Sequence, residues 1–541
     1  MLGNATCEQS CSLTFSFSDI RIIGKGRRIQ MKKIAHLLLG RFSIVAVSII
    51  LQFLWLVMVM YQFSYQFTYA NLAIRTIAII VVLVIVNRWT NPANKLSWTF
   101  IILLSPVLGL LLYMIFGRSS LTKKTQERMD SVNREVSACL YQTPEIKEQL
   151  AREDLSVYRQ SRYINDWAGF PLYHNTSTKY YSCGEEMFPD MLADLEKAEH
   201  FIFLEYFIVD QGVMFDRIVE VLEQKSKEGV DVRLIYDDIG CINTLPPKYY
   251  KVLQAKGIKC AAFNPFRPIM SVVMNNRDHR KIFVVDGKVG FTGGINLADE
   301  YINVASRFGY WKDTGIRLEG EAVWSMTVMF LEMWNYINHS SEDYKQFMPQ
   351  VYQKEPFEGD GFVQPYGDTP LDHETVGENI YLNIINHAER YVYIFTPYLI
   401  IDNEMLVSLC NAAKRGVDVR IVTPGIPDKK MIFLLTQSHY EPLLKCGVKI
   451  YQYTPGFIHA KSFLCDDKIG TVGSINLDYR SLFLHFECGV FMYKTKALMQ
   501  LKEDCMDTFA ASEEMTLEFC RGQNVFIRIF QGMMRLFAPL L

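Results

Sequence analysis

The sequence predicts an α/β protein in which membrane-spanning N-terminal helices precede two copies of one α/β domain. Three observations predict this architecture: strand-like and helix-like segments alternate, similar segments recur about 180–190 residues apart, and the N-terminal region contains long uncharged runs. Such alternation favours a mixed or parallel sheet covered by helices. A period of this length indicates duplication of a whole domain rather than a short solenoid repeat.

The composition agrees with a membrane-associated protein of more than one domain. The chain has 541 residues, half of them hydrophobic, which is a high share for a soluble enzyme. The net charge of −2 provides no bulk attraction for nucleic acid, so we expect no nucleic-acid partner. The twelve cysteines are scattered without a CxxC pair, which argues against zinc and indicates a reducing compartment.

The N-terminal region is predicted to comprise a polar and basic extension, 1–33, and a membrane region, 34–117. Met31 is followed by two lysines and resembles a start of translation, so one hypothesis is that residues 1–30 are an untranslated extension, and the sequence does not decide it. Spans are expected at about 42–61, 70–87 and 96–116. The first is uncharged and long enough to cross a bilayer. The second contains Arg75 and is either a third span or an interfacial segment, and the third contains Pro106, which membrane helices tolerate.

Basic residues flank these runs and predict the topology. Under the positive-inside rule they place both the N-terminus and the catalytic part in the cytoplasm, which requires an even number of crossings. We therefore expect a multi-pass protein of the cell membrane with cytoplasmic catalytic domains, whereas three crossings would place them outside. The basic residues concerned are Lys32, Lys33, Arg41, Arg88, Lys95, Arg118, Lys123 and Lys124.

The rest of the chain divides into a charged connector, two domains and a tail. We expect the connector over 118–165, the first domain over 166–345, the second over 346–520 and a basic amphipathic tail over 521–541. The tail either lies on a membrane or packs against the protein core. In the first domain the predicted elements are a helix over Met187–Glu199, a strand over Phe201–Val209, a helix over Met214–Glu228 and a strand over Val230–Tyr236. The second domain repeats several segments, for example Gly229–Arg233 as Gly416–Arg420.

One motif with chemical character occurs in both domains. His279 and Lys281 are followed by Asp286 and by a Gly-Gly-Ile-Asn sequence that ends at Asn296. The second copy has the same offsets, at His459, Lys461, Asp466 and Asn476. A histidine and a lysine two apart lie on one face of a strand. Imidazoles that move protons, beside cations and small residues that admit an anion, suggest phosphate chemistry.

Phosphodiester exchange needs two such motifs at one site. One histidine attacks phosphorus and the other protonates the leaving alkoxide, while two lysines and two asparagines, Asn296 and Asn476, donate to the phosphate oxygens. An attacking imidazole needs its other nitrogen held by an acceptor, and the candidates are Asp313 and Glu487. Asp286 and Asp466 are expected to brace the motif loops. The chemistry requires no metal or cofactor, and we expect neither.

The paired pattern resembles the HKD motif of the phospholipase D superfamily, and the wider context resembles its bacterial cardiolipin synthase family. The resemblance covers most of the chain and rests on these segments: Trp98 to Gly117, Asn276–Lys281, Gly293–Tyr301, Trp311–Thr314, Thr396–Tyr398 and Gly473–Ser481. It implies two phospholipase D-like α/β sandwich domains, and His279 as nucleophile with His459 as acid and base. One departure is His485, where this family usually has asparagine before Phe-Glu.

The resemblance also implies a reaction and its lipid substrates. A phosphatidyl group would pass between two phosphatidylglycerol molecules of the membrane, giving cardiolipin and glycerol through a phosphohistidine. Tyr206, Tyr310, Trp311 and Tyr398 are candidates for shielding that intermediate from water, or ordinary core residues. The alternatives are a hydrolase that makes phosphatidic acid and a non-catalytic membrane scaffold. The sequence makes no prediction about protein partners.

Overall fold

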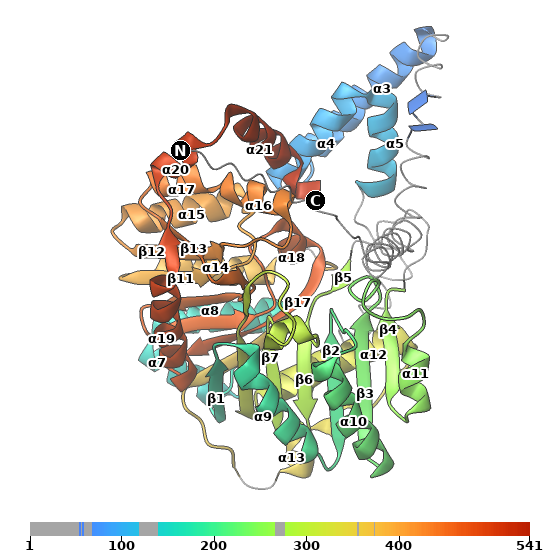
Figure 1. Ribbon diagram of the computed structural model, residues 1–541, viewed down its shortest axis with the longest axis vertical. Coiled ribbons are helices and arrows are strands. Elements are labelled where there is room, and N and C mark those ends of the chain that lie inside the picture. The colour runs from blue at the N-terminus through green and yellow to red at the C-terminus, as the bar shows by residue number, and fades with distance from the viewer. Residues whose placement is uncertain are drawn as a thin grey trace, which may run out of the picture. The chain divides into compact units, whose positions relative to one another are not determined.

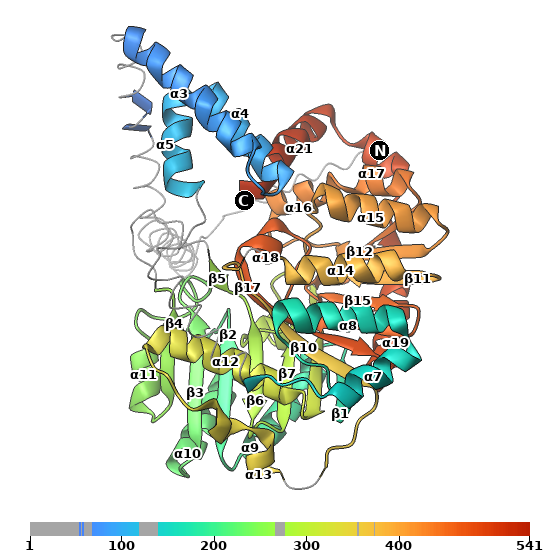
Figure 2. The same ribbon diagram turned by 180° about the vertical axis from the view of Figure 1, so that it is seen from behind.

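The computed structural model (Figures 1 and 2) describes residues 54–55, 57–58, 68–117, 139–265, 276–353, 356–372 and 374–540. The chain divides into two compact units, 1–73 and 74–541. Both predicted α/β domains lie in the second unit. The extension predicted over 1–33 lies outside the described residues, as does nearly all of the first predicted span, 42–61.

The first α/β domain is built on a mixed sheet with the strand order β1-β9-β7-β6-β2-β3-β4. The strands β2, β3 and β4 are parallel, and the neighbours from β1 to β2 are antiparallel. The strands are β1 (Thr176–Tyr181), β2 (Phe201–Tyr206), β3 (Asp231–Asp237), β4 (Lys259–Phe263), β6 (Lys281–Val285), β7 (Val289–Gly293) and β9 (Gly315–Gly320).

The second domain repeats this topology. Its sheet has the order β10-β17-β16-β15-β11-β12-β13-β18, in which β11, β12 and β13 are parallel and the other neighbours antiparallel. The predicted duplication into two α/β domains is thereby confirmed. The strands are β10 (Phe362–Asp368), β11 (Tyr391–Phe395), β12 (Asp418–Pro424), β13 (Lys449–Tyr453), β15 (Ser462–Cys465), β16 (Ile469–Gly473), β17 (His485–Tyr493) and β18 (Ser512–Glu514).

Helices cover both faces of each sheet and tie the domains together. In the first domain, α9 (Gly184–Glu196) and α10 (Val213–Lys227) lie on one face and α12 (Val323–Asn338) on the other (Figures 1 and 2). Alternate residues of β2 separate accordingly, with Phe203 in the core beneath α12 and Leu204 in the core beneath α10. Further α-helices of the two domains are α11 (Tyr250–Ala255), α13 (Pro349–Tyr352), α14 (Val376–His387), α15 (Asn403–Lys414), α16 (Lys430–Gln437), α17 (Tyr440–Lys445), α18 (Tyr479–Phe483), α19 (Lys496–Ala510) and α20 (Leu517–Gly522).

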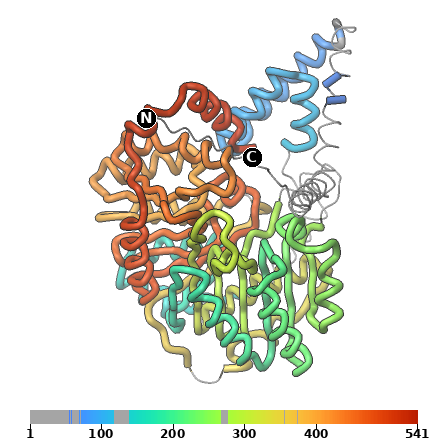
Figure 3. The backbone as a smooth tube through the Cα atoms, in the orientation of Figure 1, coloured from blue at the N-terminus to red at the C-terminus, as the bar shows by residue number. Residues whose placement is uncertain are grey.

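The last helix of each domain reaches the other domain. The helix α12 also packs on β10, and α19, which packs on β13 and β15, also packs on β1. The core beneath α12 therefore continues into the second domain, where it includes Val363 and Phe463. The continuous tube of Figure 3 shows the two domains side by side. This shared core fixes the two motifs relative to each other.

The predicted connector, 118–165, is described from residue 139. It contains α7 (Pro144–Glu153) and the start of α8 (Leu155–Ala168). The Asp154 side chain accepts hydrogen bonds from the N–H groups of Ser156 and Val157 and so caps α8, which ends at Gly169 with φ of 79°. The helix α8 packs against α14 and β10, so this part of the connector belongs to the second domain.

The N-terminal helices of the described region are α3 (Thr68–Val86), α4 (Pro92–Leu104) and α5 (Pro106–Phe116). The expectation of one continuous helix over 96–116 is wrong, because the chain breaks at Ser105, with φ of −140° and ψ of 84°. Pro106 lacks an N–H and disfavours the helical conformation of the residue before it, so a new helix starts there. Within the part of the chain that the structure describes, no helix combines the length and the apolar character needed to cross a membrane.

The C-terminal tail forms α21 (Val525–Phe537), which packs against the protein on one side and is exposed on the other. Ser97 Oγ of α4 donates a hydrogen bond of 2.6 Å to the Leu536 carbonyl. Met534 and Ala538 pack in a small core with Leu435 of α16. The opposite side exposes apolar side chains: Val525, Phe526, Ile529 and Met533. The interpretation of a helix that packs against the protein describes the docked face, and membrane binding by the exposed face stays a prediction.

Candidate active site

The segment that leads into each motif is bound to the other domain. Ahead of His279, β5 (Arg277–Asp278) pairs with the start of β17, so that Asp278 lies opposite Phe486. Ahead of His459, β14 (Gly456–Ile458) pairs with β8 (Tyr310–Lys312) of the first domain. These two inter-domain strand pairings correspond to each other, as the two duplicated domains do. They bring residues of each domain beside the histidine of the other.

Each motif histidine is held by a carboxylate from the opposite domain. His279 Nδ1 lies 2.9 Å and 3.0 Å from the two carboxylate oxygens of Glu487. His459 Nδ1 lies 2.6 Å from Asp313 Oδ2. Both carboxylates are fully buried and both imidazoles nearly so. With Nδ1–H donated to a carboxylate, Nε2 of each ring keeps its lone pair for attack on phosphorus or for proton transfer.

The motif lysines lie against the histidines in the same buried space. Lys281 Nζ donates to the His279 carbonyl at 2.6 Å, and Lys461 Nζ donates to the His459 carbonyl. Lys461 Nζ is also 2.8 Å from His459 Nδ1. One nitrogen cannot donate to Asp313 and accept from an ammonium at once. The shorter carboxylate contact fixes the tautomer, and the ammonium acts through its charge.

Burial and crowding of like charges depress the pKa values of these groups. Burial lowers the pKa of Lys281 to about 8 and that of Lys461 to about 7, although Glu487 and Asp313 oppose the shift. Burial and the neighbouring lysines lower the pKa of His459 to about 4 and that of His279 well below its usual range. Both imidazoles are therefore neutral at neutral pH, as a nucleophile or base requires.

The two motif asparagines make contacts within the protein. Asn296 Oδ1 accepts from the Ile208 N–H at 3.0 Å, and its Nδ2 donates to the Tyr301 hydroxyl at 2.8 Å. Asn476 Nδ2 donates to Ser481 Oγ at 3.0 Å, and its Oδ1 has no hydrogen-bond partner in the described part of the chain. Rotation of the Asn476 amide keeps the serine contact, because a hydroxyl also donates, and frees an N–H donor.

The motif aspartates lie apart from the histidines, at the far ends of β6 and β15. Asp286 accepts hydrogen bonds of 2.8 Å from the N–H groups of Glu199, His200 and Phe201. Asp466 likewise accepts from the N–H groups that begin β11, those of Glu389, Arg390 and Tyr391. Both residues have positive φ, 51° and 54°. Each aspartate closes the turn after its strand and fixes the start of the neighbouring strand.

The residue after the first glycine of the Gly-x-Ile-Asn sequence differs between the domains: it is Gly294 in the first and Ser474 in the second. Each lies beside the carboxylate that holds a motif histidine. A Cβ on Gly294 would lie 2.0 Å from Asp313 Oδ1, so only glycine admits that carboxylate. At the equivalent position Ser474 Oγ donates a hydrogen bond of 2.5 Å to Glu487 Oε2. The sequence analysis missed this contact, although the Gly–Ser difference between otherwise matching motifs marked the position.

Aromatic rings line the histidines. Trp311 and Tyr301 lie with ring centroids 5.5 Å and 5.6 Å from that of His459, and Phe207 lies 4.9 Å from His279. Of the predicted wall residues, only Trp311 contacts a histidine ring. The others lie elsewhere: Tyr206 is buried in β2 opposite Lys281, Tyr310 is 39% exposed, and Tyr398 donates to Asp428. Phe207 and Tyr301 were not anticipated.

Comparison with known proteins identifies the family. A family model described as "Cardiolipin synthase, PLD-like domain" matches residues 191–306 and 381–507. Cardiolipin synthase 1 of Bacillus cereus is 34% identical over 518 residues, which cover 94% of this chain and all of that protein. The chain belongs to the cardiolipin synthase family. Both matched segments end beyond a motif, so each includes one histidine of the pair.

Other relatives extend the similarity. An uncharacterized protein of Streptococcus mutans is 46% identical over 85% of this chain and 99% of its own length. The cardiolipin synthase of Geobacillus kaustophilus is 34% identical over 86% of this chain. A second family model, phospholipase D-nuclease N-terminal, matches residues 76–118. Among solved structures, phosphatidylserine synthase of Haemophilus influenzae shares the fold, with a TM-score of 0.52, 13% identity and coverage of 72% of this chain and 98% of its own.

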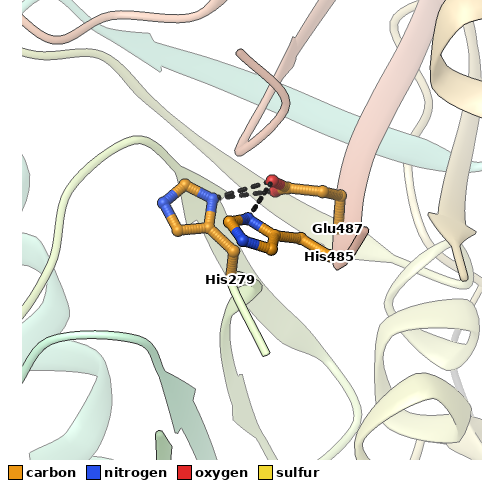
Figure 4. A group of neighbouring side chains, drawn as sticks. All are labelled: His279, His485 and Glu487. Atoms are coloured by element: carbon orange, nitrogen blue, oxygen red, sulfur yellow. Dashed lines mark hydrogen bonds and ion pairs between the residues drawn. The ribbon is translucent and has the colours of Figure 1, made fainter. Parts of the chain in front are cut away.

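His485 distinguishes this chain from the cardiolipin synthase pattern described above. Its Nδ1 lies 3.7 Å from Glu487 Oε1, and its ring centroid is 5.6 Å from that of His279 (Figure 4). Neither ring nitrogen has a hydrogen-bond partner among the described residues. Burial lowers the pKa of His485 to about 4. A second neutral imidazole therefore shares the carboxylate that orients His279.

Proposed function

We propose that this protein is a cardiolipin synthase that transfers a phosphatidyl group between two phosphatidylglycerol molecules, releasing glycerol. The observation that carries the proposal is the crossed arrangement, in which both motif histidines are buried and each is held by a carboxylate of the other domain. Membership of the cardiolipin synthase family supports the substrate class. The ring nitrogens left free are the atoms that a two-step displacement at phosphorus needs.

In the first step, we infer that His279 Nε2 attacks the phosphorus of one phosphatidylglycerol. The bond from phosphorus to the headgroup glycerol oxygen breaks, and the departing oxygen takes a proton from Nε2 of His459, which is neutral in the free enzyme and takes up that proton from solvent when the anionic phosphodiester binds beside it. The product is a phosphohistidine on His279 and free glycerol. Asp313 stabilises the imidazolium form of His459 that this step requires, because its carboxylate accepts from Nδ1.

In the second step the roles of His459 are reversed. Its neutral Nε2 takes a proton from a headgroup hydroxyl of a second phosphatidylglycerol, whose oxygen attacks the phosphohistidine and restores His279. Lys281 and Lys461 neutralise the non-bridging oxygens, and Asn296 and Asn476 are proposed as further donors. Asp286 and Asp466 contribute by fixing the motif strands.

The main alternative is a hydrolase in which water accepts the phosphatidyl group. Burial of both histidines and the rings of Trp311, Tyr301 and Phe207 favour a lipid acceptor, because they limit access of water to the intermediate. A non-catalytic scaffold would have no need for a neutral, oriented imidazole in each motif.

We also propose that the chain acts at the cell membrane as a multi-pass protein with cytoplasmic catalytic domains. The lipid substrates, the uncharged run 42–61 and the bare apolar face of α21 support this. Met534 of α21 and Ala538, which follows this helix, pack with Tyr479 and Phe483 of α18, the helix that follows Asn476. Membrane contact at α21 would thus lie near the second motif.

The orientation in the membrane is tested by protease accessibility. We expect the catalytic domains to be cleaved in sealed inverted vesicles but not in intact spheroplasts.

Product analysis tests the proposed reaction. Membranes that carry the wild-type chain or a His279→Ala or His459→Ala variant receive phosphatidylglycerol labelled in its headgroup glycerol, and lipid and water-soluble products are separated. We expect cardiolipin and free glycerol from the wild type only. Phosphatidic acid as the main lipid product would identify a hydrolase. Activity that survives either substitution would contradict the two-motif mechanism.

A further inference from the structure

His279, His485 and Glu487 form a compact cluster of metal-ligating side chains (Figure 4). One ligand atom from each residue lies within 4.8 Å of the other two. Glu487 Oε1 is 2.9 Å from His279 Nδ1 and 3.7 Å from His485 Nδ1. Figure 4 shows the carboxylate facing both rings, with an interaction drawn to each. The residues come from β17 and from the segment that pairs with it.

His485 has no place in the reaction proposed above. Its side chain is 10% exposed, and neither ring nitrogen finds a hydrogen-bond partner within the described ranges. Burial of a polar ring without a partner costs free energy. A buried imidazole whose nitrogen faces a carboxylate and another imidazole is suited to share a bound cation with them.

We propose that His279, His485 and Glu487 form a binding site for a zinc-class divalent ion and that its occupation inhibits the enzyme. Two imidazole nitrogens and one carboxylate oxygen are a common ligand set for zinc, with water in the fourth position. In a tetrahedral site neighbouring ligand atoms stand roughly 3.3–3.5 Å apart, given metal–ligand distances near 2 Å. The two separations from Glu487 Oε1, 2.9 Å and 3.7 Å, bracket that value, and all three ligand atoms lie within 4.8 Å of one another, so side-chain movements can complete the site.

Occupation of this site disables the nucleophile. The ion takes the place of the proton on His279 Nδ1, which is released to solvent, and it occupies the Glu487 oxygen that accepted from that nitrogen. An imidazole bound to a dication through Nδ1 is a weaker nucleophile at Nε2, because the cation withdraws electron density. Binding of the ion does not rest on the proposed function. Its inhibitory effect does.

Zinc sensitivity should depend on the residue at position 485. Asparagine, which the family resemblance leads us to expect there, carries an amide nitrogen that has no free lone pair for a metal. His485→Asn therefore removes one ligand and introduces the residue that the family resemblance leads us to expect. His485→Gln is a second variant with the same effect on the ligand set. His387→Asn is the matched control, because His387 is exposed on α14 and its Nδ1 contacts the Asn383 carbonyl at 2.7 Å.

The binding experiment uses the detergent-solubilised full chain, freed of metal by a chelator and titrated with Co²⁺ as a spectroscopic substitute for Zn²⁺. We expect visible bands of tetrahedral Co²⁺ at one ion per chain in the wild type and in His387→Asn, and their loss on addition of Zn²⁺. In His485→Asn and His485→Gln the affinity should fall at least about tenfold. If both His485 variants bind Co²⁺ with the affinity of the wild type, or if the wild type shows no tetrahedral Co²⁺, the proposal is overturned.

The inhibition experiment measures cardiolipin formation against free Zn²⁺, each protein relative to its own metal-free rate. We expect half-inhibition of His485→Asn to require at least about ten times the Zn²⁺ that the wild type requires. Equal sensitivity would overturn the inhibitory role. If the metal-free wild type makes no cardiolipin, the proposed function fails, and the Co²⁺ spectrum still decides whether the site exists.

Discussion

Glu487 accepts a hydrogen bond from His279, a residue 208 positions earlier, at 2.9 Å across the boundary between the two domains. Asp313 and His459, 146 positions apart, make the reciprocal contact at 2.6 Å. Each domain therefore supplies one imidazole and the carboxylate that orients the other. Neither domain alone contains a motif histidine oriented in this way, so we expect both domains to be required for function.

Replacement of either carboxylate should impair chemistry more than binding. In Glu487→Gln the side chain keeps its size but can offer an N–H to His279 Nδ1, which favours the wrong tautomer. We expect kcat to fall by about 10²–10⁴-fold with little change in KM, and a similar result for Asp313→Asn. Steady-state kinetics with phosphatidylglycerol in mixed micelles measures both constants. Glu441→Gln, at a partly exposed side chain on α17, is the control. A rise in KM alone would assign Glu487 to substrate binding.

Gly294→Ala tests whether Asp313 must approach the backbone of the motif. The new Cβ would lie 2.0 Å from Asp313 Oδ1, so the carboxylate has to move away from His459. We expect a loss of activity comparable with that of Asp313→Asn. Ser474→Ala, at the equivalent position, adds no atoms and removes one hydrogen bond to Glu487. It should cost about 1.5–3 kcal/mol of transition-state stabilisation, or roughly 10–150-fold in kcat. Full activity of Gly294→Ala would show that Asp313 has room to adjust.

The activity should decline on the alkaline side because Lys461 loses its proton. Burial lowers the pKa of Lys461 to about 7, so the ammonium that neutralises the phosphate is present below that pH and lost above it. We expect kcat/KM to fall as the pH rises beyond about 7–8. The pKa of His279 lies well below its usual range, so protonation of the nucleophile should cause no loss down to about pH 6.

Lys461→Arg separates this cause from others. The guanidinium keeps its charge throughout this range, so the alkaline decline should move to higher pH even if the maximal rate is reduced. The measurement is kcat/KM from about pH 5.5 to 9 for both proteins, after a check that each stays folded across that range. An unchanged alkaline decline in Lys461→Arg would assign it to a different group.

Asp286 should contribute to stability rather than to chemistry. Asp286→Ala leaves the N–H groups of Glu199, His200 and Phe201 without their acceptor in a buried turn. We expect a loss of about 3–5 kcal/mol in the free energy of unfolding, seen as a lower Tm. Asp286→Asn keeps a carbonyl acceptor and tolerates the positive φ, so its Tm should fall less. If Asp286→Ala keeps its Tm but loses activity, the aspartate has a role in catalysis.

Much of the fold could be predicted from local patterns. The helix expected over Met187–Glu199 is α9, Gly184–Glu196, and the strand expected over Val230–Tyr236 is β3, Asp231–Asp237. Recurrence of Gly229–Arg233 at Gly416–Arg420 revealed the duplication, because the two segments lead into equivalent strands of the two sheets, β3 and β12. The break at Ser105 was missed because an uncharged run does not distinguish one membrane helix from two shorter helices around a proline.

The partners within the site depend on how the two domains pack, which no local pattern encodes. Asp313 and Glu487 could be named as acceptors, but which histidine each one holds follows from the exchanged strands β5 and β14. Phe207 escaped notice because an aromatic residue after a buried strand is ordinarily part of a core. Orientation of Asn296 toward Ile208 and Tyr301 is likewise a property of the folded loop.

Trapping the covalent intermediate tests the central claim most directly. The His459→Ala variant, given phosphatidylglycerol labelled at phosphorus and quenched in alkali, is digested and its labelled peptide sequenced. The account predicts label on His279 in His459→Ala, because the first displacement proceeds slowly without the acid while the second lacks its base, and no label in His279→Ala. Label on His459 in the His279→Ala variant, together with no label on His279 in the His459→Ala variant, would reverse the assigned roles. Absence of any labelled histidine during measurable turnover would contradict the two-step mechanism.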